Sequence, residues 1–171
     1  CFVYRDSLYV FGGTDNSSNM NEIVRYDLST QNSGEWTTIA KVNEANQRGG
    51  VAFVVEDKVY AGLGEKSSGI RNGFYVSSDS LTKWEPIPSI PAQLGVISSG
   101  VYDEQKKSFF MIDNDGKIWE YNLTTAQWTS RSLWIRMKNY HMFMLDGSIY
   151  ILGQDIYQKN KFTVYNPIWD N

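Results

Sequence analysis

The chain alternates apolar runs and short polar turns in a pattern that occurs four times. Each occurrence begins with an apolar run, at residues 2–4, 51–55, 96–102 and 142–145. A polar turn follows, and then a second apolar run built around one aromatic anchor: Tyr9, Tyr60, Phe110 or Tyr150. Two apolar runs separated by a short polar turn are typical of a β-hairpin, so the pattern predicts four hairpins.

Each hairpin is followed by another aromatic position and then by a tryptophan. The pairs are Tyr26 with Trp36, Tyr75 with Trp84, Tyr121 with Trp128, and Tyr165 with Trp169. They predict a third and a fourth strand in every unit, although the last pair leaves little room for a turn around Pro167. No stretch shows a sustained helical period of apolar residues flanked by caps, so we expect essentially no helix.

The spacing of the anchors predicts the architecture. They lie 51, 50 and 40 residues apart, and a repeat of about 40 to 50 residues is typical of a four-stranded propeller blade. The four units run approximately over residues 1–41, 42–92, 93–132 and 133–171, within one domain or segment. Because a single blade cannot bury both of its faces, we expect neighbouring blades to stack, with the aromatic residues and the tryptophans packed between them.

The repeat resembles the Kelch motif, an apolar hairpin ending in Tyr-x-x-Gly-Gly, then Tyr-Asp, then a tryptophan. The first unit shows it best, with Tyr9, Gly12-Gly13, Tyr26-Asp27 and Trp36. The resemblance implies an all-β propeller of Kelch type, similar to the central domain of galactose oxidase, with four four-stranded blades. The copper chemistry of galactose oxidase needs a cysteine-linked tyrosine and histidine ligands, and one histidine and one terminal cysteine cannot supply them.

A second resemblance lies in the second unit. Residues 77–84 are similar to the Asp-box of sialidase-like propellers, Ser-x-Asp-x-Gly-x-Thr-Trp, but carry Leu81 and Lys83 where glycine and threonine are usual. In that family the box is a structural turn between the last two strands of a blade, so it supports the fold and implies no catalysis.

Kelch-like propellers usually close with six or seven blades, so four units predict an incomplete arc. Both end faces of such an arc would be uncovered apolar surfaces, which soluble monomers rarely expose. Three options remain open. The chain is a piece of a longer protein, or a partner such as another copy completes the ring, or four blades close on their own. A strand-like run that begins at Phe2 favours the first option.

Composition and charge exclude several classes of function. The 171 residues contain 16 Lys and Arg against 19 Asp and Glu, and the net charge of −3 gives no general attraction to nucleic acid. A single His and a single Cys cannot form the usual zinc or copper site. No apolar run approaches the length of a membrane span. We expect no cofactor, no metal, no nucleic-acid partner and no membrane span.

The resemblance places the ligand-binding face on the loops between the second and third strands of a blade and between consecutive blades. On this chain those loops carry the candidate ligand-binding residues Asp15, Arg48, Glu65, Arg71, Trp134, Lys138, His141 and Asp155. Such a mixture of cations, acids and amides suits a sugar, whose hydroxyls both donate and accept hydrogen bonds, and an arginine can hold a carboxylate.

Each candidate also has a structural interpretation. Arg48 is the first to test, and its alternative role is a bond to a neighbouring blade. His141 is the one side chain that normally titrates near neutral pH, but it begins an apolar run and is expected to be packed. Trp134 lies in a connection between blades and could form a binding surface. Asp113 and Asp115 resemble the opening of a calcium loop, but a hairpin turn explains them better.

These observations favour a non-catalytic module that recognises a carbohydrate or a protein through these loops. The alternative is that the chain forms part of a larger propeller enzyme acting on sugars, such as a sialidase or a sialic-acid isomerase, with some catalytic groups elsewhere. The many Asn, Ser and Tyr residues and the sialidase-like turn favour an extracytoplasmic location, either secreted, periplasmic or at the cell surface.

Overall fold

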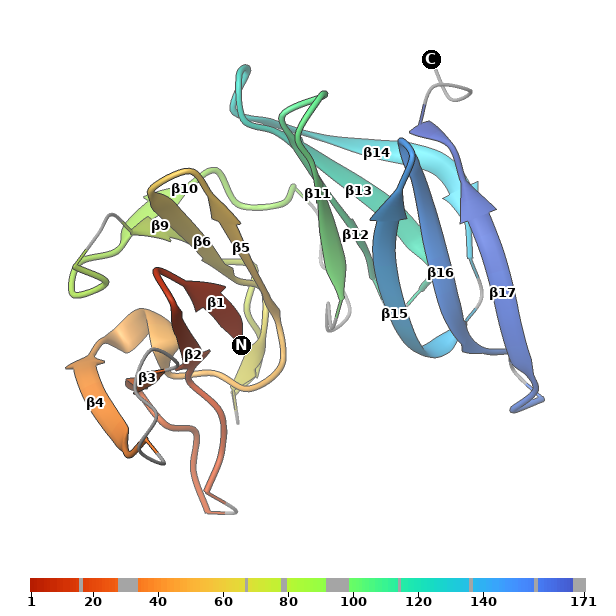
Figure 1. Ribbon diagram of the computed structural model, residues 1–171. Helices are drawn as coiled ribbons and strands as arrows, with labels where there is room; N and C mark the ends of the chain where they lie inside the picture. Colours follow the sequence, from red (N-terminus) through yellow and green to blue (C-terminus); the bar gives the residue numbers. More distant parts are fainter. Residues whose placement is uncertain are drawn as a thin grey trace. The chain divides into compact units, whose positions relative to one another are not determined.

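The computed structural model describes residues 1–15, 17–27, 34–66, 68–77, 80–91, 99–113, 115–135, 137–155 and 157–167. Regular structure in these residues is β-strand apart from one short 3-10 helix, η1 (Asn43–Ala45) (Figure 1). The prediction of an all-β fold with essentially no helix is confirmed. The chain divides into two compact units, Cys1–Ser89 and Ile90–Asn171, and each contains two antiparallel blades.

Blade 1 is a four-stranded antiparallel sheet whose strands follow chain order. Its strands are β1 (Phe2–Tyr4), β2 (Ser7–Phe11), β3 (Glu22–Asp27) and β4 (Trp36–Lys41). The turn between β1 and β2 consists of Arg5 and Asp6, with φ of 45° and 55°. Positive φ at both central residues gives a two-residue turn whose twist matches the strands it joins, so the register pairs Phe2 with Tyr9.

Blade 2 also has four strands, with an extra hairpin inserted at one end. Its strands are β5 (Val51–Val55), β6 (Lys58–Gly62), β9 (Phe74–Ser77) and β10 (Glu85–Ile87), in that spatial order. The inserted hairpin is β7 (Glu65–Lys66) and β8 (Gly69–Ile70), which pair with each other. This hairpin lies in the connection between β6 and β9, one of the loops predicted to bind a ligand.

The core of the first unit lies between blades 1 and 2. Blade 1 contributes alternate residues of its strands, because successive side chains of a strand point to opposite faces. The buried members of the cluster are Phe2, Tyr4, Tyr9, Ile23, Ala45, Val59, Ala61, Leu81 and Trp84. The aromatic anchor Tyr9 thus packs against the aliphatic Val59 and Ala61 of the next blade, as the sequence pattern predicted for stacked blades.

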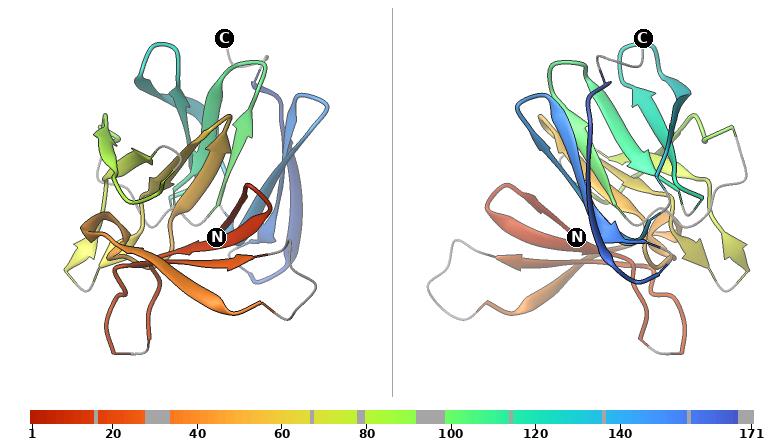
Figure 2. Two further views of the ribbon diagram at one scale, coloured as in Figure 1. Left: turned by 60° about the vertical axis from the view of Figure 1, so that its left-hand side comes forward. Right: turned by 90° about the vertical axis from the view of Figure 1, so that its right-hand side faces the viewer.

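The second unit contains blade 3 and blade 4. Blade 3 consists of β11 (Gly100–Asp103), β12 (Ser108–Ile112), β13 (Lys117–Asn122) and β14 (Gln127–Trp134). Blade 4 consists of β15 (Lys138–Leu145), β16 (Ser148–Gln154) and β17 (Asn160–Tyr165), a single twisted sheet in both views of Figure 2. The fourth strand predicted around Trp169 lies outside the described residues.

The core of the second unit repeats the arrangement of the first. The anchor Phe110 of blade 3, which is fully buried, belongs to one cluster with Ile149 and Ile151 of blade 4. These isoleucines flank the anchor Tyr150 in sequence, as Val59 and Ala61 flank Tyr60. In both units, therefore, the anchor of one blade packs against two aliphatic residues that flank the anchor of the next blade.

One expectation about the tryptophans is wrong. Trp84 is buried at 8% exposure, but Trp36, its counterpart in blade 1, is 53% exposed. The ring of Trp36 contacts Tyr26, its cross-strand partner, with 5.4 Å between centroids. Trp36 lies on the face of blade 1 that points away from the core with blade 2, so the expectation that every such tryptophan packs between blades fails at this position.

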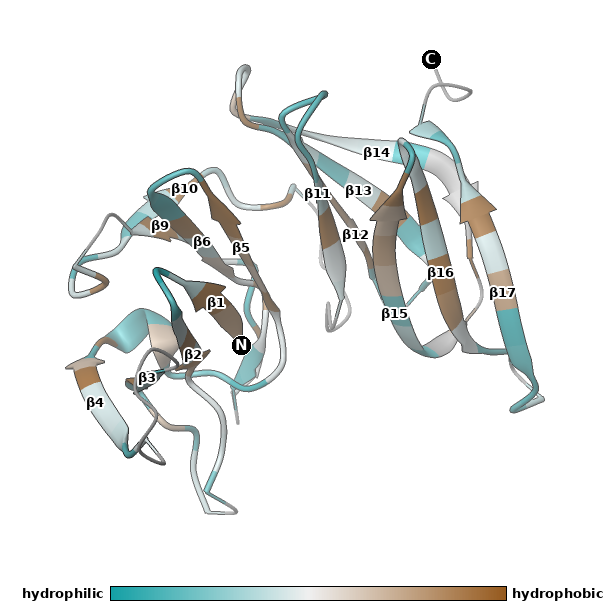
Figure 3. Cartoon of the chain, in the orientation of Figure 1, coloured by the Kyte–Doolittle hydropathy of each residue, from teal (hydrophilic) through white to brown (hydrophobic). Residues whose placement is uncertain are grey.

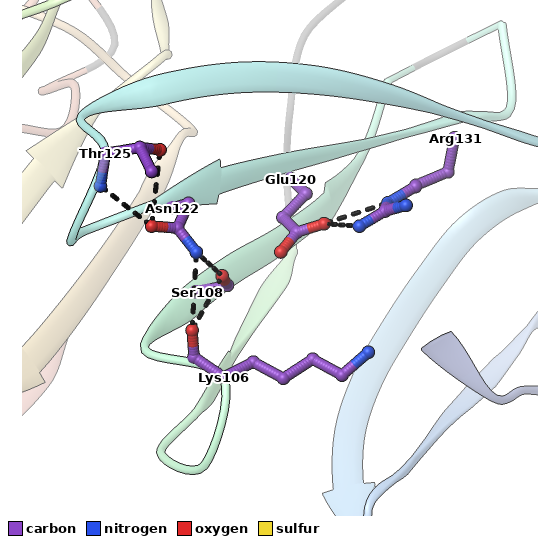
Figure 4. A network of polar contacts seen from close by, with 6 residues as sticks. All are labelled: Lys106, Ser108, Glu120, Asn122, Thr125 and Arg131. Carbon is purple, nitrogen blue, oxygen red and sulfur yellow. Dashed lines mark hydrogen bonds and ion pairs between the residues drawn. The ribbon is translucent and has the colours of Figure 1, made fainter. Parts of the chain in front are cut away.

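Blade 3 also holds a polar network on its strands (Figure 4). The Arg131 guanidinium donates to Oε2 of Glu120 from Nε, at 2.8 Å, and from Nη2. The side chains of Glu120 and Arg131 are 7% and 18% exposed. Nearby, Asn122 Nδ2 donates to Ser108 Oγ at 3.2 Å, and its Oδ1 accepts from the Thr125 amide at 2.9 Å. The paired charge of Arg131 is therefore structural rather than available to a ligand.

Candidate ligand-binding surface

Three loops of the first unit meet at one end of its blades. They connect β2 with β3, β4 with β5, and β6 with β9. Backbone hydrogen bonds join them: the Gly13 amide donates to the Gln47 carbonyl at 2.8 Å, and Arg48 and Glu65 exchange two bonds of 3.0 and 2.9 Å. Because main-chain bonds hold the loops together, the backbone positions from which their side chains project are fixed relative to one another.

Gly12 shows why a glycine is needed directly after β2. Its φ is +69°, and a Cβ atom on it would lie 2.1 Å from the Ala45 carbonyl oxygen. Any side chain at this position would push the end of β2 away from the loop that carries η1. The glycine of the Kelch-like motif therefore allows the close approach of two of the three loops.

The side chains of Arg48 and Glu65 form an ion pair on this surface. Nε of Arg48 lies 2.6 Å from Oε1 of Glu65, and the two side chains are 56% and 30% exposed. Asn19 adds a bond from Nδ2 to the Glu65 carbonyl at 2.9 Å. The structural role considered for Arg48 is thus present, since it bonds to an acid of blade 2. Its Nη1 and Nη2 groups have no recorded partner among the described residues.

Arg71 lies beside this pair. Its amide donates to the Gly64 carbonyl at 2.8 Å, one residue from Glu65, and its Nη1 donates to the carbonyl of Asn43 at 3.4 Å. Gln47, the residue before Arg48, is 1% exposed and accepts a bond from the Gly64 amide through Oε1 at 3.3 Å. Arg48, Glu65 and Arg71 therefore lie close together, and the buried side chain of Gln47 holds the backbone at Gly64, next to Glu65.

Asp15 organises the turn of its own loop, and its predicted part in ligand binding stays a prediction. Its Oδ1 accepts bonds from the Ser18 amide at 2.9 Å, the Ser17 hydroxyl at 2.8 Å and the Ser17 amide at 3.0 Å. These bonds, the one from the Ser18 amide above all, favour the charged form and lower the pKa of Asp15 to about 2. Asp15 thus organises the turn of its own loop, and one of its oxygens is fully occupied.

In the second unit, His141 is brought to a pocket. An open pocket of about 550 Å³ lies on blade 4. Its lining consists of Asn139, His141, Leu152, Gly153, Gln154, Asn160, Lys161 and Phe162. His141 is exposed, so the expectation of a packed histidine is wrong. Its neighbours in register are Leu152 and, one strand further, Phe162. Sequence reasoning missed these pocket residues because they occupy ordinary alternating positions of predicted strands.

Asp155, another candidate of this unit, is not among the residues that line the pocket. Asp155 accepts bonds from the amides of Tyr157 at 2.8 Å and Lys159 at 3.0 Å, so it organises the turn between β16 and β17. The side chains of Lys138 and Trp134 lie outside what the structure describes, and their predicted roles stay predictions.

The resemblance to a calcium loop has a structural explanation. Oδ1 of Asp113 accepts bonds from the amides of Asp115 and Lys117, each at 3.0 Å, and Oδ2 accepts from Nε1 of Trp119 at 3.1 Å. These bonds make Asp113 the centre of a hairpin turn, which agrees with the turn interpretation. Within the described residues, no group of three or more His, Cys, Asp or Glu side chains is arranged to hold a metal ion.

The segment that resembles an Asp-box includes Ser78 and Asp79, which lie outside the described residues. In the rest of the segment, Ser77 Oγ donates to the Lys83 carbonyl at 2.6 Å, and Trp84 Nε1 donates to the Leu81 carbonyl at 3.1 Å. Leu81, which replaces the usual glycine, has a φ of +55° and is 2% exposed. The described part is thus a tight turn closed by its first and last residues.

Comparison with known proteins supports the fold. Residues 1–43 match the Kelch motif. Among solved structures, YjhT is similar, with a TM-score of 0.60 and 10% sequence identity over 89% of this chain and 64% of YjhT. This chain therefore spans less than two thirds of the length of that structure, and at this identity the likeness shows the fold alone. In total 189 chains of solved structures match, whereas no curated protein sequence does.

The described residues contain no helix that could cross a membrane. Propellers of the Kelch type are binding modules in general, so the comparison agrees with a role in recognition without naming a ligand. The motif match in blade 1 and the succession of antiparallel blades assign the chain the Kelch-type β-propeller fold.

Proposed function

We propose that the loop surface of the first unit binds a carbohydrate that carries a carboxylate, without catalysing its conversion. The observation that carries the proposal is the arrangement of Arg48. Its Nε is anchored to Glu65 at 2.6 Å while more than half of its side chain is exposed, at 56%. An anchored guanidinium loses little rotamer freedom on binding, and its Nη donors can hold a carboxylate in a two-pronged pair.

The neighbouring groups suit the rest of a sugar. Hydroxyls both donate and accept hydrogen bonds, so a sugar site needs both kinds of partner. Arg71 adds a second cation, and the partly exposed carboxylate of Glu65 adds an acceptor. The backbone bridge between Arg48 and Glu65 fixes the distance between the two loops that present these groups. Preorganisation of this kind lowers the entropic cost of binding.

The test is a glycan array that contains acidic and neutral sugars, followed by titration calorimetry on the best hit. We expect saturable binding to carboxylated glycans and a loss of about tenfold or more in affinity for Arg48→Ala, because a hydrogen bond to a charged group is worth about 1.5 to 3 kcal/mol. Arg48→Lys keeps the charge but loses the paired geometry, so it should fall between the wild type and Arg48→Ala.

Arg5→Ala is the matched control. Arg5 also forms an exposed ion pair, with Nη2 of Arg5 3.3 Å from Oδ1 of Asp57, but it belongs to the turn between β1 and β2 rather than to the three loops. Its removal should leave glycan binding unchanged. A protein ligand captured with no glycan signal would contradict the carbohydrate part of the proposal, and turnover of an acidic sugar by this chain would contradict the non-catalytic part. An extracytoplasmic location suits such a ligand and stays a prediction.

A further inference from the structure

The inserted β7–β8 hairpin places an exposed apolar residue beside the ion pair of Arg48 and Glu65. Ile70 belongs to β8 and is 48% exposed. It is not a member of the buried cluster between blades 1 and 2. Hydrophobic residues of these blades lie along their strands, as β1 and β5 show in Figure 3, whereas Ile70 lies in the connection between β6 and β9. The exposed side chain of Ile70 is therefore part of the loop surface, where binding residues concentrate.

The backbone pairing places Ile70 on the same side as the ion pair. Arg48 pairs with Glu65 in an antiparallel bridge, and Glu65 pairs with Ile70 within the hairpin. Side chains directly opposite each other in antiparallel pairs project from the same face. The three residues therefore form one row across three adjacent backbone segments, with Glu65 in the middle. We call it the Arg48–Ile70 row.

The hydrogen bonds of the hairpin bring Glu65 and Ile70 close together. The amide and the carbonyl of Glu65 are both bonded to Arg48, at 2.9 and 3.0 Å, and the Arg71 amide donates to the Gly64 carbonyl at 2.8 Å. Glu65 and Ile70 are thus a non-hydrogen-bonded pair, the kind in which opposite side chains lie closer. Since neighbouring strands lie about 4.8 Å apart, the row is roughly 10 Å long between its outer backbones.

The chemistry along the row changes from a cation to a carboxylate to a hydrocarbon. At one end, the Nη groups of Arg48 can hold a carboxylate in a two-pronged pair. In the middle, the carboxylate of Glu65 accepts hydrogen bonds, as a sugar hydroxyl needs. At the other end, Ile70 offers hydrocarbon and no hydrogen bond. A pyranose ring matches such an end, because its C–H groups make a ring face apolar while its hydroxyls lie mainly at the rim.

From this order we infer that the Arg48–Ile70 row binds a hexuronic acid, with the carboxylate at Arg48 and a C–H face of the ring on Ile70. The inference rests on the proposed function and adds the class of sugar and the residue that selects it. The carboxylate of a hexuronic acid is equatorial, so it lies near the plane of the ring. The ring can therefore lie along the row while its carboxylate meets Arg48.

An open-chain sugar acid separates the role of Ile70 from that of Arg48. Gluconate has a carboxylate and hydroxyls but no closed ring, and so presents no ring face to an aliphatic side chain. Methyl β-glucuronoside has the same kinds of polar group on a ring that cannot open. Arg48 should therefore contribute to the binding of both compounds, whereas Ile70 should contribute only to the binding of the glucuronoside.

Titration calorimetry with these two compounds tests the inference. We expect the wild type to bind the glucuronoside more tightly than gluconate. Ile70→Ser should lower the affinity for the glucuronoside about fourfold or more, the contribution of roughly one buried methylene group. It should leave the affinity for gluconate unchanged. Ile70→Val keeps a branched aliphatic side chain and should retain most of the preference for the ring.

Val3→Ser is the matched control. Val3 is an aliphatic residue of the same unit and is 58% exposed, but it lies in β1, outside the three loops. Its replacement should change neither affinity. Circular dichroism shows whether each variant is folded, and Ile70→Ser should be, because substitutions of exposed side chains have small effects on stability.

Two results would overturn the inference while the proposed function stands. The first is a wild type that binds gluconate as tightly as the glucuronoside, with both lost in Arg48→Ala. The second is a folded Ile70→Ser variant that keeps the full preference for the ring. A different result, binding of both compounds that persists unchanged in Arg48→Ala, would contradict the proposed function itself and this inference with it.

Discussion

Blades 1 and 2 each carry a tryptophan at the same place in the repeat, and the two side chains have opposite environments. Trp84 is 8% exposed, donates from Nε1 to the Leu81 carbonyl at 3.1 Å and packs against Phe11. Trp36 is 53% exposed and contacts Tyr26. The residue type and its position are the same, so the difference comes from the neighbour. A repeat encodes the shape of a blade, and burial depends on what packs against that blade.

The largest expected effect on stability is that of Trp84→Ala, compared with Trp36→Ala. Trp84→Ala should reduce the free energy of unfolding by about 3 to 5 kcal/mol, because it removes a buried aromatic side chain and leaves a cavity. Trp36→Ala should cost less than about 1 kcal/mol at concentrations where the chain is monomeric, because much of this ring is already in water. Urea unfolding followed by circular dichroism measures both values. Equal losses of unfolding free energy in the two variants would contradict the difference in burial between Trp84 and Trp36.

The strand pattern is the part of the fold that the sequence predicts best. The anchors Tyr9, Tyr60, Phe110 and Tyr150 all lie in second strands, and polar turns precede them as expected. This success has a local cause, since a short turn fixes the register of a hairpin and alternation fixes its faces. The exposure of Trp36 depends on a neighbouring sheet, which no local pattern contains.

The candidate site was predicted only in part, for a similar reason. The loops that carry Arg48, Glu65 and Arg71 follow from the order of strands, and they do come together. The ion pair between Arg131 and Glu120 was not foreseen. In the register of β13 and β14, Glu120 lies opposite Thr129, and Arg131 follows two residues later, within reach as a diagonal neighbour. That register could not be read from residue spacing alone.

A second pair of substitutions compares the anchor surfaces of blades 1 and 4. Ile23 and Phe162 are the cross-strand partners of Phe11 and Leu152, and so occupy equivalent positions. Ile23 is fully buried and Phe162 is 55% exposed. Ile23→Ala should therefore cost about 2 to 5 kcal/mol of unfolding free energy, and Phe162→Ala less than about 1 kcal/mol.

Phe162→Ala is best measured at a protein concentration at which sedimentation shows a monomer. A large loss of unfolding free energy for Phe162→Ala in the monomer would mean that its ring is covered within a single chain. The comparison between the two blades would then be wrong for this position.

The smallest expected effect concerns acid and the loop of blade 1. The bonds from the Ser18 and Ser17 groups lower the pKa of Asp15 from its ordinary value to about 2. Because the folded pKa lies below the ordinary one, the carboxylate stabilises the folded loop above about pH 4, and that stabilisation is lost as the pH falls towards 2. Asp15→Asn should remove this part of the acid sensitivity while the ion pair of Arg48 and Glu65 remains. Titration of the Asp15 side chain by NMR measures the pKa directly. A midpoint near 4 would mean that the three hydrogen bonds are not kept in solution, and the turn that presents the β2–β3 loop to the candidate surface would then lack its main constraint.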